Sequence, residues 1–136
     1  MIGTVSSNEK EIVYFSAYFP SGGDGTYSGY LNFPTITDNI GGGTYTNSVY
    51  TVPSDGLYQA TFNFYSNSGS ECRCAVFHIT DDITEYDMSK FGYAGSITGV
   101  WYCKKGEKLA AGACPGYSIN FYRAKNHNRF YICKIK

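Results

Sequence analysis

Charged side chains are scarce in this chain of 136 residues. They make up 16% of it, and 11 basic residues balance 11 acidic ones. A chain without a charge excess has no long-range field to attract nucleic acid or an anionic membrane, so we predict neither as a partner. It also lacks a run of 18 apolar residues, which predicts no membrane insertion. Residues 1–12 lack the apolar core of a secretory signal. This leaves open a chain that is not secreted by that route and a trimmed mature product.

Signatures of catalysis and of metal binding are also missing. There is no CxxC pair of the kind that zinc sites use, and no catalytic cysteine motif. Only two histidines occur, His78 and His127. His78 lies in a strand-like stretch, where the ordinary interpretation is a hydrogen-bonded side chain at a sheet face and the alternative is a Cys–His nucleophilic pair. His127 is typical of a turn. We therefore predict that the protein is not an enzyme.

The five cysteines have an odd count, which leaves at least one thiol unpaired within a chain. They are Cys72, Cys74, Cys103, Cys114 and Cys133. Cys72 and Cys74 share one face of a strand, and a bond between them would be strained, so partners on neighbouring strands are favoured. Three interpretations stay open: one or two disulfides, free buried thiols throughout, or a metal site.

Aromatic side chains are abundant. The chain contains 14 Tyr and 9 Phe, and 43% of its residues are hydrophobic, which is too apolar for a disordered protein. No stretch shows a sustained helical period, whereas strand patterns recur about every dozen residues. Within 57–65, Tyr58, Ala60, Phe62 and Phe64 alternate with polar neighbours, which predicts a half-buried strand. Further strands are predicted at 12–19, 30–33, 74–79, 96–103, 108–114, 118–124 and 129–135.

Turn residues separate these strands. Glycine and asparagine supply positive φ in them, and Pro53 fixes a corner that ends at Gly56, directly before the alternating strand. About eight short strands with even turn spacing predict an all-β sandwich or jelly roll. We predict a single domain over 1–136, with its core in 13–135 and a flexible lead at 1–12.

The order of several short motifs resembles the globular head of complement component 1q and its relatives in the tumour necrosis factor superfamily. The resemblance spans about residues 13 to 135 and makes the chain a divergent member. The matching motifs are Phe15-Ser16-Ala17, Leu31-Asn32-Phe33, Asn39-Ile40-Gly41 with Tyr45, Tyr50 followed by Pro53-Ser54-Asp55-Gly56-Leu57-Tyr58, Phe62 and Phe64, Trp101 and Cys103 followed by Gly106-Glu107 and Leu109, and Phe130. Ser48 and Ile132 stand where the family has glycine, and Glu107 stands where it has aspartate.

The resemblance implies a ten-strand-type jelly roll with two antiparallel sheets that assembles as a compact homotrimer. It gives six aromatic residues a place in the core or the trimer interface: Phe15, Phe33, Tyr58, Phe62, Phe64 and Phe130. It also implies that the strand with Cys72 and Cys74 lies between the strand of Cys114 and the last strand, which carries Cys133. Cys103 falls on the other sheet and is implied to be a free thiol.

Candidate ligand-binding residues lie outside the core pattern. Tyrosines in loops offer a rigid ring and a hydroxyl for recognition, although packing at strand ends is the bland alternative. We name Tyr86, Tyr93 and Tyr117, with Asp81 and Asp82 beside them. The acidic stretch 81–87 holds four carboxylates that are calcium candidates, because some family members bind calcium, and a solvated acidic loop is the alternative. These four are Asp81, Asp82, Glu85 and Asp87.

Two functions follow as expectations. The first is a non-enzymatic, trimeric recognition module, secreted or extracellular, whose loops bind glycans, proteins or microbial surfaces in the manner of a lectin or an innate-immune pattern-recognition protein. Three weak sites on one rigid head would raise avidity. The alternative is a structural trimeric knob on a virus, phage or spore. No cofactor is expected apart from the possible calcium.

Overall fold

The computed structural model describes residues 11–19, 25–65, 71–121 and 128–136. They form a sandwich of two five-stranded antiparallel sheets, with strand orders β3-β1-β12-β6-β9 and β4-β5-β10-β7-β8. The first sheet contains β1 (Tyr14–Tyr18), β3 (Thr35–Ile40), β6 (Gly56–Tyr65), β9 (Ala94–Cys103) and β12 (Arg129–Lys134). The second contains β4 (Thr44–Thr46), β5 (Val49–Thr51), β7 (Cys72–Ile79), β8 (Thr84–Phe91) and β10 (Lys108–Ala113).

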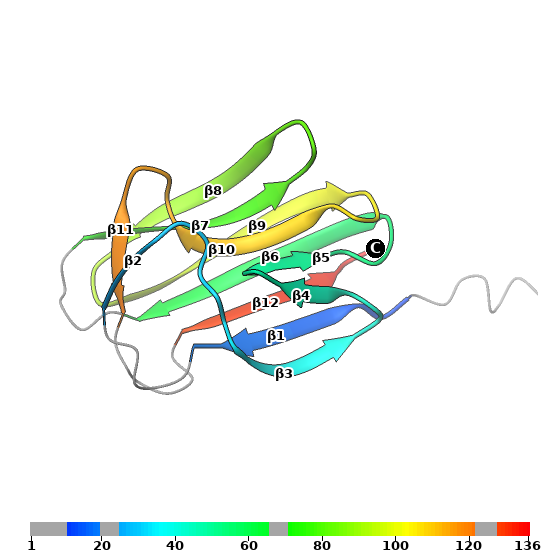
Figure 1. Cartoon of the computed structure of the whole chain (residues 1–136), viewed down its shortest axis with the longest axis horizontal. Helices are drawn as coiled ribbons and strands as arrows, with labels where there is room; N and C mark the ends of the chain where they lie inside the picture. The colour runs from blue at the N-terminus through cyan, green and yellow to red at the C-terminus, as the bar shows by residue number, and fades with distance from the viewer. Residues whose placement is uncertain (1–10, 20–24, 66–70, 122–127) are drawn as a thin grey trace, which may run out of the picture.

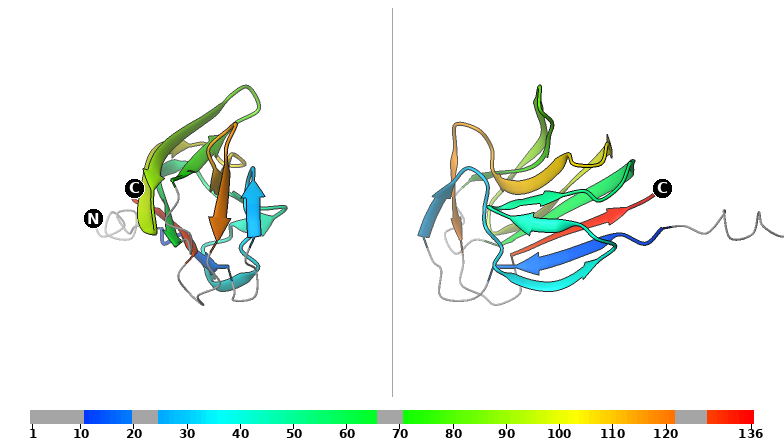
Figure 2. Two further views of the ribbon diagram at one scale, coloured as in Figure 1. Left: turned by 90° about the vertical axis from the view of Figure 1, so that its left-hand side faces the viewer. Right: turned by 45° about the vertical axis from the view of Figure 1, so that its right-hand side comes forward.

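A third, two-stranded sheet pairs β2 (Gly25–Ser28) with β11 (Ser118–Phe121). It lies across one end of the sandwich, and the C-terminus lies at the opposite end (Figure 1). Figure 2 shows the two large sheets layered face to face. The prediction of an all-β jelly roll with two antiparallel sheets is confirmed. No helix in the part of the chain that the structure describes is long and apolar enough to cross a bilayer.

The core fills the space between the two large sheets. All six aromatic residues expected in the core or the interface are buried between the sheets; the side chains are those of Phe15, Phe33, Tyr58, Phe62, Phe64 and Phe130. Phe33 has its ring centroid 5.6 Å from both Phe62 and Phe130, and Phe62 and Phe130 are paired across β6 and β12. Side chains of a strand alternate between its two faces, so these residues are absent from the outward faces, where subunits would meet.

The corner before β6 is held by its own residues. The Tyr58 hydroxyl donates a hydrogen bond to the Ser54 carbonyl at 2.8 Å. A Cβ atom at Gly56 would overlap the Lys134 side chain and lie 2.7 Å from the Lys136 carbonyl oxygen, so only glycine fits there without a shift. The turn signal at 53–56 therefore marks the start of β6, the alternating strand that the sequence predicts.

Several strands differ from the expectation. The stretch 81–87, expected as an acidic loop, is a turn followed by β8, which pairs with β7 along its whole length. As an edge strand, β8 is exposed on both faces and therefore shows no apolar alternation. The β4–β5 hairpin was not predicted either. Of the expected strand 30–33, residues 31–33 lie outside any strand, and Tyr30 makes an isolated bridge to Gly112.

The cysteine arrangement corrects one implication of the resemblance. β7, which holds Cys72 and Cys74, lies between β10 and β8 and not beside the last strand. β12, with Cys133, lies in the other sheet because β1 and β6 flank it there. Cys103 does lie on the opposite sheet from β7. All five cysteines are free, and all except Cys133 are buried.

Candidate functional site

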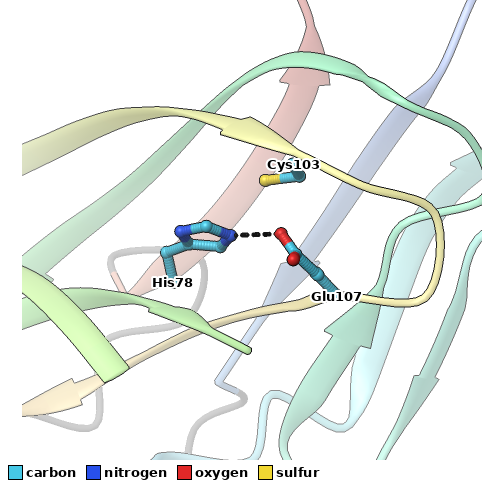
Figure 3. A group of neighbouring side chains, drawn as sticks. All are labelled: His78, Cys103 and Glu107. Atoms are coloured by element: carbon cyan, nitrogen blue, oxygen red, sulfur yellow. Dashed lines mark hydrogen bonds and ion pairs between the residues drawn. The ribbon is translucent and has the colours of Figure 1, made fainter. Parts of the chain in front are cut away.

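A cluster of three potentially metal-ligating side chains lies at the end of the sandwich opposite the β2–β11 sheet (Figure 1). We call this end the open end. His78 projects inward from β7, Cys103 projects inward from the end of β9, and Glu107 follows the turn that joins β9 to β10 (Figure 3). One ligand atom from each residue lies within 4.8 Å of the others. Two strands from opposite sheets and one turn therefore converge on the cluster.

Hydrogen bonds fix the imidazole of His78 on both sides. Its Nε2 lies 2.8 Å from Glu107 Oε1, and its Nδ1 lies 3.0 Å from Glu85 Oε1. The ring also stacks on Trp101, with centroids 5.8 Å apart and an interplanar angle of 30°. His78 is thus a hydrogen-bonded side chain within the sheet, as expected, although it faces the interior and contacts carboxylates from β8 and from the β9–β10 turn.

The electrostatics of the cluster argue against nucleophilic catalysis. Burial raises the pKa of the Cys103 thiol to about 12, and the charges of Glu107 and Glu85 act in the same direction. A thiol in this state is protonated at neutral pH and is a poor nucleophile. Burial also acts to raise the pKa of Glu107, but the Lys104 backbone N–H and the bond from His78 outweigh it, so this pKa is lowered.

A polar pocket of about 610 Å³ adjoins the cluster and shares Glu107 with it. Three lysines, Asp81 and the backbone of the β9–β10 turn line it; the lysines are Lys104, Lys105 and Lys108. Lys104 N–H donates to Glu107 Oε1 at 3.1 Å, and Lys105 N–H donates to Asp55 at 2.7 Å. The pocket therefore reaches Glu107, whereas His78 and Cys103 are not among its lining residues.

A second pocket, of about 540 Å³, lies on the outward face of the second sheet beside β11. Tyr30, Phe77 and Tyr117 line it with Thr84 and the hydroxyls of Ser28 and Ser118. The rings of Tyr30 and Phe77 meet edge to face at 4.8 Å. The Arg73 guanidinium lies 4.5 Å from the centre of the Tyr117 ring. We call this the aromatic pocket.

The outward face of the first sheet is nearly uncharged. The side chains that alternate away from the core of this sheet include two formal charges, Arg129 on β12 and Asp38 on the edge strand β3. Val100 and Tyr102 are 47% and 60% exposed on this face. Asn63 Nδ2 donates to the Tyr131 hydroxyl, and the hydroxyls of Thr61 and Thr98 lie 3.0 Å apart, so most polar groups there pair with one another. We call this outward surface of the first sheet, which includes β6, the outer face of β6.

The predicted ligand-binding residues separate into three places. Tyr117 lines the aromatic pocket, and Tyr86 packs on its Phe77 with ring centroids 5.7 Å apart. Tyr93 lies in the β8–β9 turn and is 63% exposed. Asp81 and Asp82 lie in the β7–β8 turn, and Asp81 lines the polar pocket. They therefore do not form one site.

The four calcium candidates do not converge. Within the described ranges, the one group of three potential metal-ligating side chains is His78, Cys103 and Glu107, and it includes none of the four. Glu85 gives a carboxylate oxygen to His78, and the turn with Asp82 is organised by Thr80, whose hydroxyl accepts the N–H groups of residues 82 and 83. Calcium needs several oxygen ligands around one point, and these four carboxylates are not gathered in that way. His127 lies outside the described residues.

Sequence reasoning did not bring His78, Cys103 and Glu107 together. His78 is far in the chain from the other two, and Cys103 and Glu107, although close in sequence, match no spacing motif. The available signals were a histidine at an inward position of a strand and a glutamate directly after a glycine turn. Neither identifies a partner without the pairing of the strands.

Comparisons with known proteins give information on the fold alone. No family model matches the sequence, and no curated protein matches it. Among solved structures, the chain is similar to the structure of Eiger TNF from S. frugiperda, with a TM-score of 0.70 and 11% identity over 93% of this chain and 94% of that one. The fold is therefore a TNF-like jelly roll. Membership of the complement 1q group stays a prediction.

Proposed function

We propose that the protein is a non-enzymatic, extracellular recognition module that assembles as a homotrimer. The observation that carries this proposal is the outer face of β6, a nearly uncharged sheet face with exposed Val100 and Tyr102. The exposed side chains of Val100 and Tyr102 on this face suit a contact with another protein surface, because clustered exposed apolar groups mark interaction sites. A second copy of the chain is the occupant we propose, in keeping with a TNF-like fold.

Light scattering tests the assembly. The wild-type protein is expected to have a mass near three times 15.0 kDa, with or without reductant because its five thiols are free. Val100→Asp places a charge in the proposed contact and is expected to give monomers. Ile83→Asp is the control, because Ile83 is 59% exposed in the β7–β8 turn, away from that face. A wild-type monomer, or a trimer that Val100→Asp leaves intact, contradicts this interface.

Ligand recognition is proposed at the aromatic pocket. Its volume lies within the range of about 300–1,000 Å³ that is common for small-molecule sites. Tyrosine rings with nearby hydroxyls suit a sugar, since the ring face packs on the apolar face of the sugar and the hydroxyls bind its edge. The function proposed for this pocket is therefore lectin-like binding of a glycan.

A printed glycan array probed with the purified protein tests this part. Tyr117→Ala removes one wall of the aromatic pocket and is expected to abolish wild-type binding. Tyr93→Ala is the control, because Tyr93 is also exposed but lies in the β8–β9 turn, away from the pocket. A trimer that binds no glycan on the array favours the structural knob instead. Binding that Tyr117→Ala leaves unchanged places the ligand elsewhere.

A further inference from the structure

We propose that His78 Nε2, Cys103 Sγ and the Glu107 carboxylate bind one Zn²⁺ ion. A water molecule takes the fourth position, and Glu85 supports the imidazole from behind. The site is independent of the recognition function, and it ties the two sheets together at the open end of the sandwich. Its ligands come from β7, the end of β9 and the β9–β10 turn.

The donor set selects the metal. A thiolate, an imidazole and a carboxylate together suit zinc, whereas calcium and magnesium take oxygen ligands. Sites with three protein ligands leave one position open to water. Here Glu107 is the ligand on the side of the polar pocket, from which a water molecule would reach the fourth position.

The distances fit a site that closes on the ion with small movements. Zinc bonds of about 2.0–2.3 Å in a tetrahedron separate ligand atoms by about 3.5 Å. The three ligand atoms now lie within 4.8 Å of one another, and His78 Nε2 is 2.8 Å from Glu107. The nitrogen and oxygen must move apart and the sulfur must approach. Glu107 has the freedom to move, because its side chain is 23% exposed at a turn.

Glu85 makes the second argument for a metal. A histidine that ligates zinc through one nitrogen usually donates its other N–H to a carboxylate, which fixes the ring and raises its basicity. His78 Nδ1 meets Glu85 Oε1 at 3.0 Å, so Nε2 is the nitrogen that faces Glu107 and Cys103. An ion pair without metal accounts for the two carboxylates. It does not involve the Cys103 thiol, which donates a hydrogen bond to the Trp101 carbonyl at 3.7 Å.

Zinc binds cysteine as the thiolate, so the Cys103 proton is released to solvent when the Zn–S bond forms. The step needs no other reactant.

Cobalt and the single tryptophan provide direct readouts. Co²⁺ is added to the reduced, chelator-treated full chain, and excess Zn²⁺ is added afterwards. The expected result is a thiolate-to-cobalt charge-transfer band with tetrahedral visible absorption, both lost on adding Zn²⁺. Trp101 is the only tryptophan and stacks on His78, so its fluorescence is expected to be quenched by Co²⁺ in the same titration.

Variants identify the ligands. Cys103→Ser is expected to remove the charge-transfer band, and Cys133→Ser, at the accessible cysteine of β12, is expected to keep it. Glu85→Gln is expected to weaken binding by about 10–100-fold while the band keeps its shape. If Cys103→Ser does not fold by circular dichroism, Glu107→Gln takes its place, with weaker binding as the expected result. The proposal is overturned if the wild-type chain shows no thiolate band with millimolar Co²⁺. It is equally overturned if folded Cys103→Ser keeps the band or, where Glu107→Gln replaces it, if that variant binds Co²⁺ as tightly as the wild type.

Discussion

Ser48→Gly is expected to stabilise the protein, because Ser48 has a backbone conformation that favours glycine. Thr46 pairs with Val49, so Asn47 and Ser48 form the two-residue loop of the β4–β5 hairpin. Their φ values are 54° and 68°. Positive φ at both central residues is the requirement of a type I′ turn, for which Asn-Gly is the preferred sequence. The family that the sequence resembles has glycine at the position of Ser48.

The magnitude follows from two opposing effects. The left-handed region costs a residue with a Cβ atom about 1–2 kcal/mol, and glycine escapes this cost. Glycine also gives the unfolded chain more freedom, which offsets about 0.4–1 kcal/mol of the gain. The net increase in the free energy of unfolding is about 0.5–1 kcal/mol. For a chain of this size it corresponds to a rise in Tm of about 2–4 °C.

Urea denaturation measures this change, with the midpoint expected to rise at a constant m value. Ser48→Ala is the control, since alanine keeps the Cβ atom and gains nothing from the conformation. Asn47→Gly is expected to gain less than Ser48→Gly, because asparagine tolerates positive φ. A lower midpoint for Ser48→Gly, or an equal gain for Ser48→Ala, would refute the assignment of strain to this residue.

Three other changes test the core and the cluster. Tyr50→Phe is expected to leave stability unchanged or to raise it by about 1 kcal/mol in urea unfolding, because the buried Tyr50 hydroxyl has no partner among the described residues and its desolvation is not repaid; a clear loss would show a hidden hydrogen bond. The pKa of Glu107 is lowered in the folded protein, so its carboxylate stabilises the fold. This stabilisation is complete above the pKa of the unfolded chain, near 4.5, and is lost as the pH falls through the lower pKa of the folded protein. Glu107→Gln is therefore expected to be less stable than wild type at pH 7, with the gap closing below about pH 4; a gap that is constant with pH contradicts the coupling. A thiol reagent at pH 8 is expected to label Cys133 in the native protein and the four buried cysteines only after unfolding, so rapid native labelling at all five would refute their burial.

The fold could be predicted wherever burial leaves a period in the sequence. β6 is buried on one face, so Tyr58, Phe62 and Phe64 alternate with polar residues. The corner at 53–56 is also visible in the sequence, because it ends at Gly56, where a Cβ atom does not fit. β8 could not be predicted in the same way. It is an edge strand with solvent on both faces, so its residues 84–91 carry no apolar period and resemble a loop.

Strand neighbours were harder to predict than strands. The expected neighbour of the Cys72–Cys74 strand on one side was the last strand, and β8 occupies that place instead. That expectation came from the strand order implied by the resemblance and from no residue of this chain. Strand order depends on long-range pairing, which the local pattern of a strand does not encode.

The candidate site depends on the same long-range pairing. β7 and β9 belong to different sheets, so no local pattern relates His78 to Cys103, and Glu107 reaches them only because the β9–β10 turn bends over the open end (Figure 3). The chain shares its architecture with the TNF structure at 11% identity, so most side chains differ between two proteins of one fold. A function peculiar to this chain is therefore to be sought in such residues, at the aromatic pocket and at the cluster of His78, Cys103 and Glu107, and not in the framework that it shares.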